Sequence, residues 1–428
     1  DRGIHICKSM VAWKQFANGA TPESATIKGD HLVGDYYVKF GEELKKQVSE
    51  LIESGVPKEE AEKQAPIMKE AQQMLVDWEA GKPEVIELWS KMNAWVYSGF
   101  EQTYKRIGSN FDKTYYESEV YLLGKRMVEE GLKKGVFYKK EDGSVWIDLT
   151  ADGLDEKIVQ RKDGTAVYIT QDIGLVDLKH KEFGEEQSIY VVGNEQDYHF
   201  KVLKLIAQKL QIAGADGIHH LSYGMVELPT GRMKTREGTV VDADDIVDEM
   251  ESISEKHTRE LGKVNDFTEE ELKQLYTTIG LGALKFFLLR VDPKKRMVFN
   301  PEESIDFHGF TGPFIQYTYA RTKSILRKEK PSFGNRGDSL LPAEKKLIID
   351  LEKYPSILAE AALEMNPSVV ANYVFRLAQA FNSFLTEQRV LTAETQEKKE
   401  LRLQLSQFVA NVLSSGMHLL GINVPERM

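Results

Sequence analysis

The chain has 428 residues, is 41% hydrophobic, carries a net charge of −11 and contains one cysteine, Cys7. This length supplies two or three domains with proper cores, and the absence of any apolar run near about twenty residues excludes a membrane span. A single cysteine excludes disulfides within the chain, and nine histidines without zinc spacing give no structural metal site. We therefore expect a soluble, cytoplasmic protein.

The first third of the chain is predicted to be helical. Residues 6–16 have helical spacing, and because residues 1–3 are typical of a strand end or a tight turn, we interpret the chain as a fragment of a longer sheet protein. Charged amphipathic helices over 43–53, 58–78 and 83–107 predict a helical insertion at about 41–110. Its aromatic residues could form a recognition surface, although their helical spacing favours core packing: Trp78, Trp89, Trp95, Tyr97, Phe100 and Tyr104.

The sheet is expected after this insertion. A further helix precedes a hairpin of strands 136–138 and 145–147 around Asp142-Gly143. The β-branched and aromatic run 166–170 predicts a buried strand, Asp172 a cap for a helix over 173–183, and the apolar run 189–192 a second strand. Such a βαβ unit requires a parallel sheet that binds ligands at the carboxyl ends of its strands.

Two loops would then meet over that edge of the sheet. Tyr168 and Asp172 follow the first strand, and residues 193–199, with the sequence GNEQDYH, follow the second. A carboxylate beside an aromatic ring suits a planar cation, because guanidinium takes two parallel hydrogen bonds and stacks on the ring. The pattern indicates an arginine-like ligand, although spacing alone favours a structural role in which Asp172 caps its helix and Tyr168 fills the core.

A basic loop follows the next predicted strand, at 218–226. Residues 228–241 contain Arg232, Lys234 and Arg236 among glycines and threonines. Such a loop can close over phosphates and stabilise charge on a leaving group; a solvated basic hairpin fits the same residues equally well.

The remainder is predicted to be helical. Residues 266–291 read as two helices, and amphipathic helices over 314–328, 343–363, 367–387 and 395–420 predict a helical bundle. From Thr311 onward there are 15 Lys and Arg against 12 Asp and Glu, a small imbalance that permits contacts with phosphates without requiring them.

Taken together, these motifs resemble those of the arginyl-tRNA synthetases, a family of class I aminoacyl-tRNA synthetases. The resemblance covers nearly the whole chain through six stretches: DRGIHICKSM (1–10), GDYY (34–37), DGTAVYITQD (163–172), MKTREG (233–238), TGPFIQY (311–317) and LGINVPERM (420–428). It implies that Tyr168 and Asp172 hold the guanidinium of the substrate arginine and that Gln196 also faces the amino acid. The fold it implies is a doubly wound, Rossmann-like parallel sheet, incomplete at its N-terminal half, followed by an all-α bundle.

The resemblance also implies an ATP site. The loop of Lys234, Thr235 and Arg236 matches the KMSKS signature, but it has threonine where the second lysine would stand, so Lys234 and Arg236 are both candidates for stabilising pyrophosphate. Backbone groups of Met225 and Val226 would hold adenine, and the remaining ATP contacts fall at Gly193 and His199. The HIGH signature is not found in the 428 residues, so we expect this chain to hold half of the nucleotide site and to be inactive alone in adenylation.

By the same resemblance, the partners are L-arginine, ATP with Mg²⁺, and tRNA(Arg), and the enzyme is expected to be a monomer. We place the catalytic domain at 1–310 and an anticodon-binding domain at 311–428, where Tyr317 and Arg321 are candidate tRNA contacts because aromatic rings stack on unpaired bases. Two alternatives remain open from the residues: a non-catalytic tRNA- or arginine-binding protein derived from a synthetase, and a class I enzyme for another amino acid.

Overall fold

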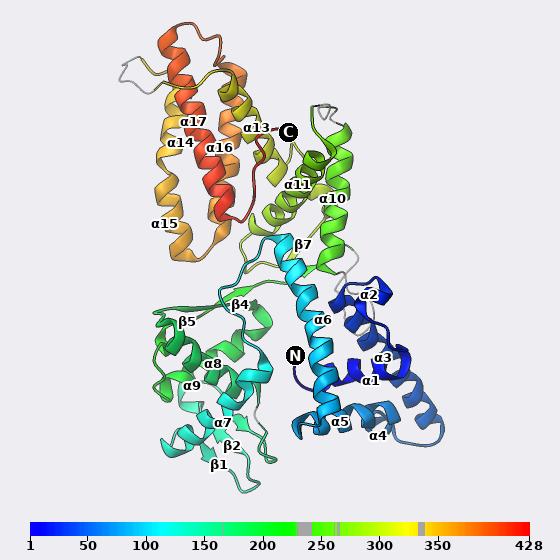
Figure 1. The fold of residues 1–428 in the computed structure, drawn as a ribbon. Helices are drawn as coiled ribbons and strands as arrows, with labels where there is room; N and C mark the ends of the chain where they lie inside the picture. Colours follow the sequence, from blue (N-terminus) through cyan, green and yellow to red (C-terminus); the bar gives the residue numbers. More distant parts are fainter. Residues whose placement is uncertain (166, 228, 230–241, 261, 263–265, 333–338) are drawn as a thin grey trace. The chain divides into compact units, whose positions relative to one another are not determined.

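The computed structural model describes residues 1–165, 167–227, 229, 242–260, 262, 266–332 and 339–428. These residues form two compact units (Figure 1). The first unit contains the residues up to Tyr190 together with Gln196–His220, and the second contains 191–195 and most of the chain beyond Leu221. Among the described residues, no helix combines the length and the apolar character needed to cross a bilayer.

Six helices begin the first unit: α1 Ile4–Phe16, α2 Pro22–Ala25, α3 Gly29–Glu53, α4 Lys58–Gln64, α5 Pro66–Glu79 and α6 Pro83–Ile107. The predicted helical character is confirmed, but the stretch 58–78 is two helices because Pro66, which lacks an amide hydrogen, begins α5. Trp78, Trp89 and Trp95 pack against the core around Met10, Phe40 and Met92. Core packing therefore accounts for these three rings, as their spacing indicated.

The predicted hairpin is confirmed, but its first strand is at 138–139 rather than at 136–138. Strands β1 Tyr138–Lys139 and β2 Val145–Ile147 pair in antiparallel fashion, and β3 Lys157–Gln160 adds a third antiparallel strand to the sheet. This sheet follows α7, Glu117–Lys133, and η1, Thr150–Asp152, lies between its last two strands.

The strand predicted at 166–170 is wrong. Residue 166 lies outside the described residues, and helix α8, Tyr168–Phe183, begins two residues later, so Asp172 lies in the second turn of the helix rather than at its cap. Ile169, Thr170, Ile173 and Val176 form its buried face, which packs on α7. Packing is close: a Cβ on Gly174 would lie 2.6 Å from the Cβ of Leu123. This burial outweighs the strand preference of the β-branched residues.

Because 166–170 is not a strand, the predicted βαβ unit is wrong as well. Strand β4, Ser188–Gly193, pairs with β5, Ile218–Tyr223, and between them lie η2 Asn194–Gln196, α9 Asp197–Lys209 and η3 Ala215–Gly217. The predicted strand 218–226 is interrupted at Gly224, whose amide donates to the carbonyl of Pro293 at 2.7 Å. Beyond this break β6, Val226–Glu227, pairs in parallel with β7, Met297–Val298, a strand that we did not predict from the sequence.

The second unit is mainly helical: α10 Ala243–Glu260, α11 Glu269–Leu289, α12 Pro301–Ser304, α13 Gly312–Lys328, α14 Pro342–Glu352, α15 Tyr354–Glu364, α16 Pro367–Glu387 and α17 Gln396–Leu419. The bundle of α13 to α17 is confirmed. Two details are wrong: residues 266–291 hold one helix, and 343–363 is divided before Pro355. Buried Gln316 joins α13 to α11 and to the chain end by donating to the carbonyls of Thr278 at 3.0 Å and Asn423 at 2.8 Å.

A buried ion-pair network joins α14 to α17. Glu344 is fully buried and accepts from Lys398 Nζ at 2.7 Å and from Arg402 Nε at 3.0 Å. Arg402, itself 1% exposed, also binds Glu394, whose side chain is 57% exposed. Burial opposes ionisation of Glu344, but hydrogen bonds from Lys398, the Leu341 amide and Arg402 outweigh it, so its pKa lies below the ordinary value of 4.5.

Because the pKa of Glu344 is lowered on folding, its stabilising contribution is complete above the unfolded value near 4.5 and is lost as the pH falls through the lower folded value. Parent and Glu344→Gln should therefore differ most in unfolding free energy at pH 6 to 7 and converge in acid. Urea unfolding of both proteins between about pH 3.5 and 7 measures this; a constant difference across that range would contradict it.

Candidate functional site

Tyr168 and Asp172 lie on the same side of α8. Tyr168 is the first residue of the helix and 73% exposed, and Asp172 follows four residues later with its side chain 40% exposed. Residues four apart lie on one face of a helix, and the buried face of Ile169, Ile173 and Val176 turns this face away from α7. The carboxylate and the ring are therefore accessible together.

Asp172 is held by a residue of the second predicted loop. His199, in the first turn of α9, lies with its Nε2 2.7 Å from Asp172 Oδ2. An ionised carboxylate can only accept, so Nε2 carries the proton and donates. Within the part of the chain that the structure describes, this is the one hydrogen bond of the Asp172 side chain. Since a carboxylate has about four acceptor positions, Asp172 can bind His199 and a guanidinium at the same time.

A stack of rings supports the start of α9. Phe200 is 9% exposed, stacks on His220 at 4.3 Å between ring centroids and contacts Tyr190 at 5.0 Å. His220 Nδ1 lies 3.1 Å from Asp197 Oδ1. Because these contacts hold the first turn of α9 in place, they also orient His199 toward Asp172.

The other predicted residues of this loop are placed less specifically. Gln196 is exposed and ends the 3₁₀ turn that precedes α9, three residues before His199. Gly193 is half-buried and ends β4. Our assignment of Gln196 to arginine and of Gly193 and His199 to ATP stays a prediction. His199 contacts Asp172, a residue predicted to hold arginine.

The two predicted adenine contacts, Met225 and Val226, differ in what their backbones face. The Met225 carbonyl accepts from the Met297 amide at 3.1 Å, so it is used in the pairing of β6 with β7. Successive residues of a strand direct their backbone groups to opposite sides. Val226 therefore directs its amide and carbonyl to the side of β6 away from β7, which makes it the better candidate for an adenine edge.

The remaining predicted residues fall into two groups. Lys234, Thr235 and Arg236 lie outside the described residues. In α13, Tyr317 packs against the hydrophobic cluster of α10 and α11, whereas Arg321 is exposed and its NH1 donates to Asn382 Oδ1 at 3.4 Å.

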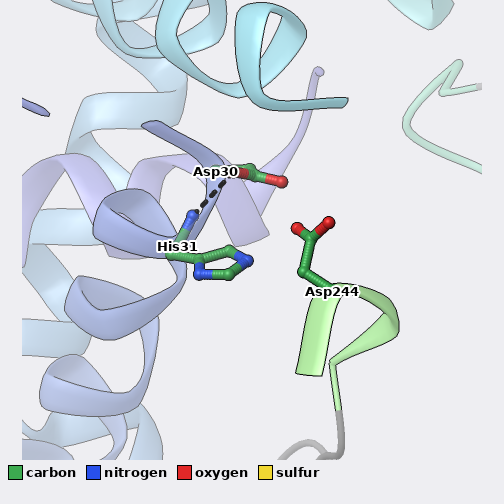
Figure 2. Close-up of side chains that lie close together, drawn as sticks. All are labelled: Asp30, His31 and Asp244. Atoms are coloured by element: carbon green, nitrogen blue, oxygen red, sulfur yellow. Dashed lines mark hydrogen bonds between the residues drawn. The ribbon is translucent and has the colours of Figure 1, made fainter. Parts of the chain in front are cut away.

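Acidic and imidazole groups also meet at the start of α3. The His31 amide donates to Asp30 Oδ1 at 3.1 Å (Figure 2), and Lys28 Nζ lies 2.9 Å from Asp30 Oδ2. These contacts stabilise the first turn of α3. Asp244, drawn in the same view, belongs to the second unit, and we assign no shared site to the three residues.

Comparison with known proteins gives two family matches. Residues 37–300 match the catalytic domain of class I tRNA synthetases of the (R) type, and residues 315–428 match the DALR anticodon binding domain. The chain is 57% identical over 430 residues to an arginine–tRNA ligase of Flavobacterium psychrophilum, covering 100% of this chain and 72% of that protein. It is 53% identical over 434 residues to the arginine–tRNA ligase of Bacteroides thetaiotaomicron, covering 100% and 73%.

Solved structures agree in fold. The chain is similar to Thermus thermophilus arginyl-tRNA synthetase with a TM-score of 0.80 at 24% identity, covering 100% of this chain and 74% of that one. It is also similar to a Mycobacterium tuberculosis methionyl-tRNA synthetase with a TM-score of 0.58 at 10% identity, covering 97% and 87%. These matches confirm the predicted class I fold with a helical C-terminal domain. The chain therefore belongs to the arginyl-tRNA synthetases, the arginine–tRNA ligases of class I.

Proposed function

We propose that the chain contributes to ATP-dependent activation of L-arginine and to transfer of the arginyl group to tRNA(Arg). In the first step the arginine carboxylate attacks the α-phosphate of ATP, giving arginyl-adenylate and pyrophosphate. In the second, a terminal ribose hydroxyl of the tRNA attacks the adenylate carbonyl and releases AMP. We further propose catalytic residues within 1–310, anticodon binding within 311–428, and action as a monomer in the cytoplasm.

One observation carries the assignment of the amino acid. Asp172 presents a half-exposed carboxylate beside the exposed ring of Tyr168, and the hydrogen bond that it accepts from His199, its one such bond among the described residues, leaves acceptor positions for a guanidinium. A guanidinium binds a carboxylate through two parallel hydrogen bonds and stacks on an aromatic ring. We assign Gln196 to the same ligand, because it directly precedes the helix that carries His199.

For ATP, we propose that Val226 contacts adenine through its backbone, together with its neighbour Met225 and with Gly193 at the end of β4. Lys234, Thr235 and Arg236 would bind the phosphates, since cations stabilise the charge that develops on a pyrophosphate leaving group. Mg²⁺ is expected to arrive with ATP as part of the substrate, and we assign no residue of this chain to it.

The activity test compares two preparations. The 428 residues contain no HIGH sequence, so we expect a polypeptide of these residues alone to give no arginine-dependent pyrophosphate exchange, with tRNA(Arg) present throughout. Addition of a homologous polypeptide that carries HIGH should restore exchange. If exchange stays absent while arginine and tRNA still bind, a non-catalytic binding function is favoured instead.

Lys234→Ala should slow activation and leave arginine affinity near parental. The lysine is assigned to charge that develops on phosphate, and loss of an interaction made only in the transition state lowers the rate without weakening ground-state binding. Pyrophosphate exchange in the restored preparation measures the first effect, and calorimetric titration of arginine measures the second. A parental exchange rate would move the assignment to Arg236.

For tRNA, we propose Arg321 as a phosphate or base contact on α13, since it is exposed. Tyr317 is the weaker candidate because its ring packs against the α10 and α11 cluster.

A further inference from the structure

The N-terminal helices enclose a groove that none of the assignments above uses. It has a volume of about 340 Å³ and lies between α1, α3 and α4. One face of α3 supplies most of its lining, because Tyr37, Gly41, Leu44 and Val48 recur at steps of three and four residues. Phe40 lies beneath and is 1% exposed. The floor of the groove is therefore largely apolar.

Three lysines line the groove, one from each helix. Lys8 comes from α1, Lys45 from α3 and Lys58 is the first residue of α4. Lys8 Nζ lies 5.6 Å from the centre of the Phe40 ring. In the described part of the chain, none of the three makes a salt bridge, whereas Lys39 on the same α3 pairs with Glu42 at 3.2 Å. Glu62 is the one acidic residue among the lining residues.

Three lysines against one glutamate give the groove lining a positive balance in a chain whose net charge is −11. Like charges around a groove of this size repel one another and raise the local concentration of anions. Cations from three separate helices suit a ligand with more than one phosphate, and the apolar floor suits a planar or apolar group beside them. A nucleotide within a nucleic-acid strand has both features, since its phosphates repeat along the strand and its base offers an apolar face.

We propose that the groove of α1, α3 and α4 binds a nucleotide of the tRNA, with backbone phosphates at Lys8, Lys45 and Lys58 and a base or ribose against Leu44 and Val48. This proposal rests on the proposed function, which supplies tRNA as the partner. It adds an RNA contact in the first unit to the anticodon contacts assigned to the second.

The test compares two double variants of equal charge. Lys45→Gln with Lys58→Gln removes two groove cations, and the matched control, Lys46→Gln with Lys63→Gln, removes two exposed lysines of the same helices that do not line the groove. We measure binding of a tRNA(Arg) transcript to each 428-residue protein at several salt concentrations. The groove variant should bind about tenfold more weakly at 0.1 M salt, with a salt slope smaller by about 1.4 to 1.8, the share of two phosphate contacts.

The outcomes separate this proposal from the proposed function. Equal losses of tRNA affinity in both variants would overturn the assignment of the groove but not the proposal that the chain binds tRNA. If the parent does not bind the transcript, the proposal of tRNA as a partner is overturned as well. Titration of AMP is a second measurement. If the groove variant binds AMP more weakly than the parent but binds tRNA equally well, the groove is a site for a free nucleotide and the tRNA assignment is overturned. Lysine acetylation of the unmodified chain needs no variant: bound tRNA should protect Lys45 and Lys58 and leave Lys46 and Lys63 reactive, and uniform reactivity would contradict the proposal.

Discussion

Asp172→Asn is expected to weaken arginine binding by about 1.5–3 kcal/mol, the contribution of hydrogen bonds to a charged group, which corresponds to a loss of roughly 10- to 150-fold in affinity. Asparagine has nearly the same shape, and its carbonyl oxygen can still accept from His199, which donates at 2.7 Å in the parent. The charge is lost and one acceptor becomes a donor, so the fold should persist while the guanidinium loses its counterion. Calorimetric titration of arginine into parent and variant measures the difference.

The same substitution elsewhere on α8 is the control. Asp177 pairs with Lys181 at 2.5 Å on the helix surface, and exposed pairs of this kind contribute little. Asp177→Asn should therefore retain parental arginine affinity and stability. Equal affinities of parent and Asp172→Asn would refute the role given to Asp172.

Glu344→Ala is expected to destabilise the C-terminal bundle by about 3–5 kcal/mol, the usual effect of breaking a buried ion pair by removing one partner. The substitution leaves Lys398 and Arg402, which are 7% and 1% exposed, without the carboxylate that joins them. Hydrogen exchange of the α14 and α17 amides measures this loss locally. Opening of these helices should require less free energy in the variant, so their amides should exchange faster.

Glu394→Ala is the matched control for this network. Glu394→Ala also removes a carboxylate that pairs with Arg402, but Glu394 is 57% exposed. We therefore expect a much smaller loss of stability than for Glu344→Ala, because solvent screens exposed pairs. Equal protection of the α14 and α17 amides from exchange in the two variants would show that the buried position of Glu344 gives it no larger stabilising effect than exposed Glu394.

Much of the helical architecture was predictable because its signals are local. Helix α6, Pro83–Ile107, was placed to the residue by a proline at its first position and by Gly108, which adopts φ 72° just beyond its end. Helix α16, Pro367–Glu387, likewise begins at a proline, after Asn366, whose side chain accepts from the Ser368 amide, but it ends at the extended residue Gln388 rather than at a glycine. The family was likewise recognisable from contiguous motifs, since a motif is a property of neighbouring residues.

The error at 166–170 shows where local signals fail. A short run of β-branched and aromatic residues cannot be assigned to strand or helix from its pattern alone. Here α7 and β3 decide: Gly124 and Gly174 allow α7 and α8 to pack closely, and the hydroxyl of Thr170 donates to the carbonyl of Val159 in β3. These partners lie 11 to about 50 residues away, so no local window contains them.

From the sequence alone came most of the helices, the class I fold, the family and the pairing of Tyr168 with Asp172 as a candidate arginine site. Only the tertiary structure showed that this pair stands on a helix rather than after a strand, that His199 donates to Asp172 from 27 residues away, and that Lys8, Lys45 and Lys58 line one groove. The physical reason is the same in each case. Periodicity and caps are set by residues within one or two turns, whereas the direction and partner of a side chain depend on which distant elements bury their apolar faces together.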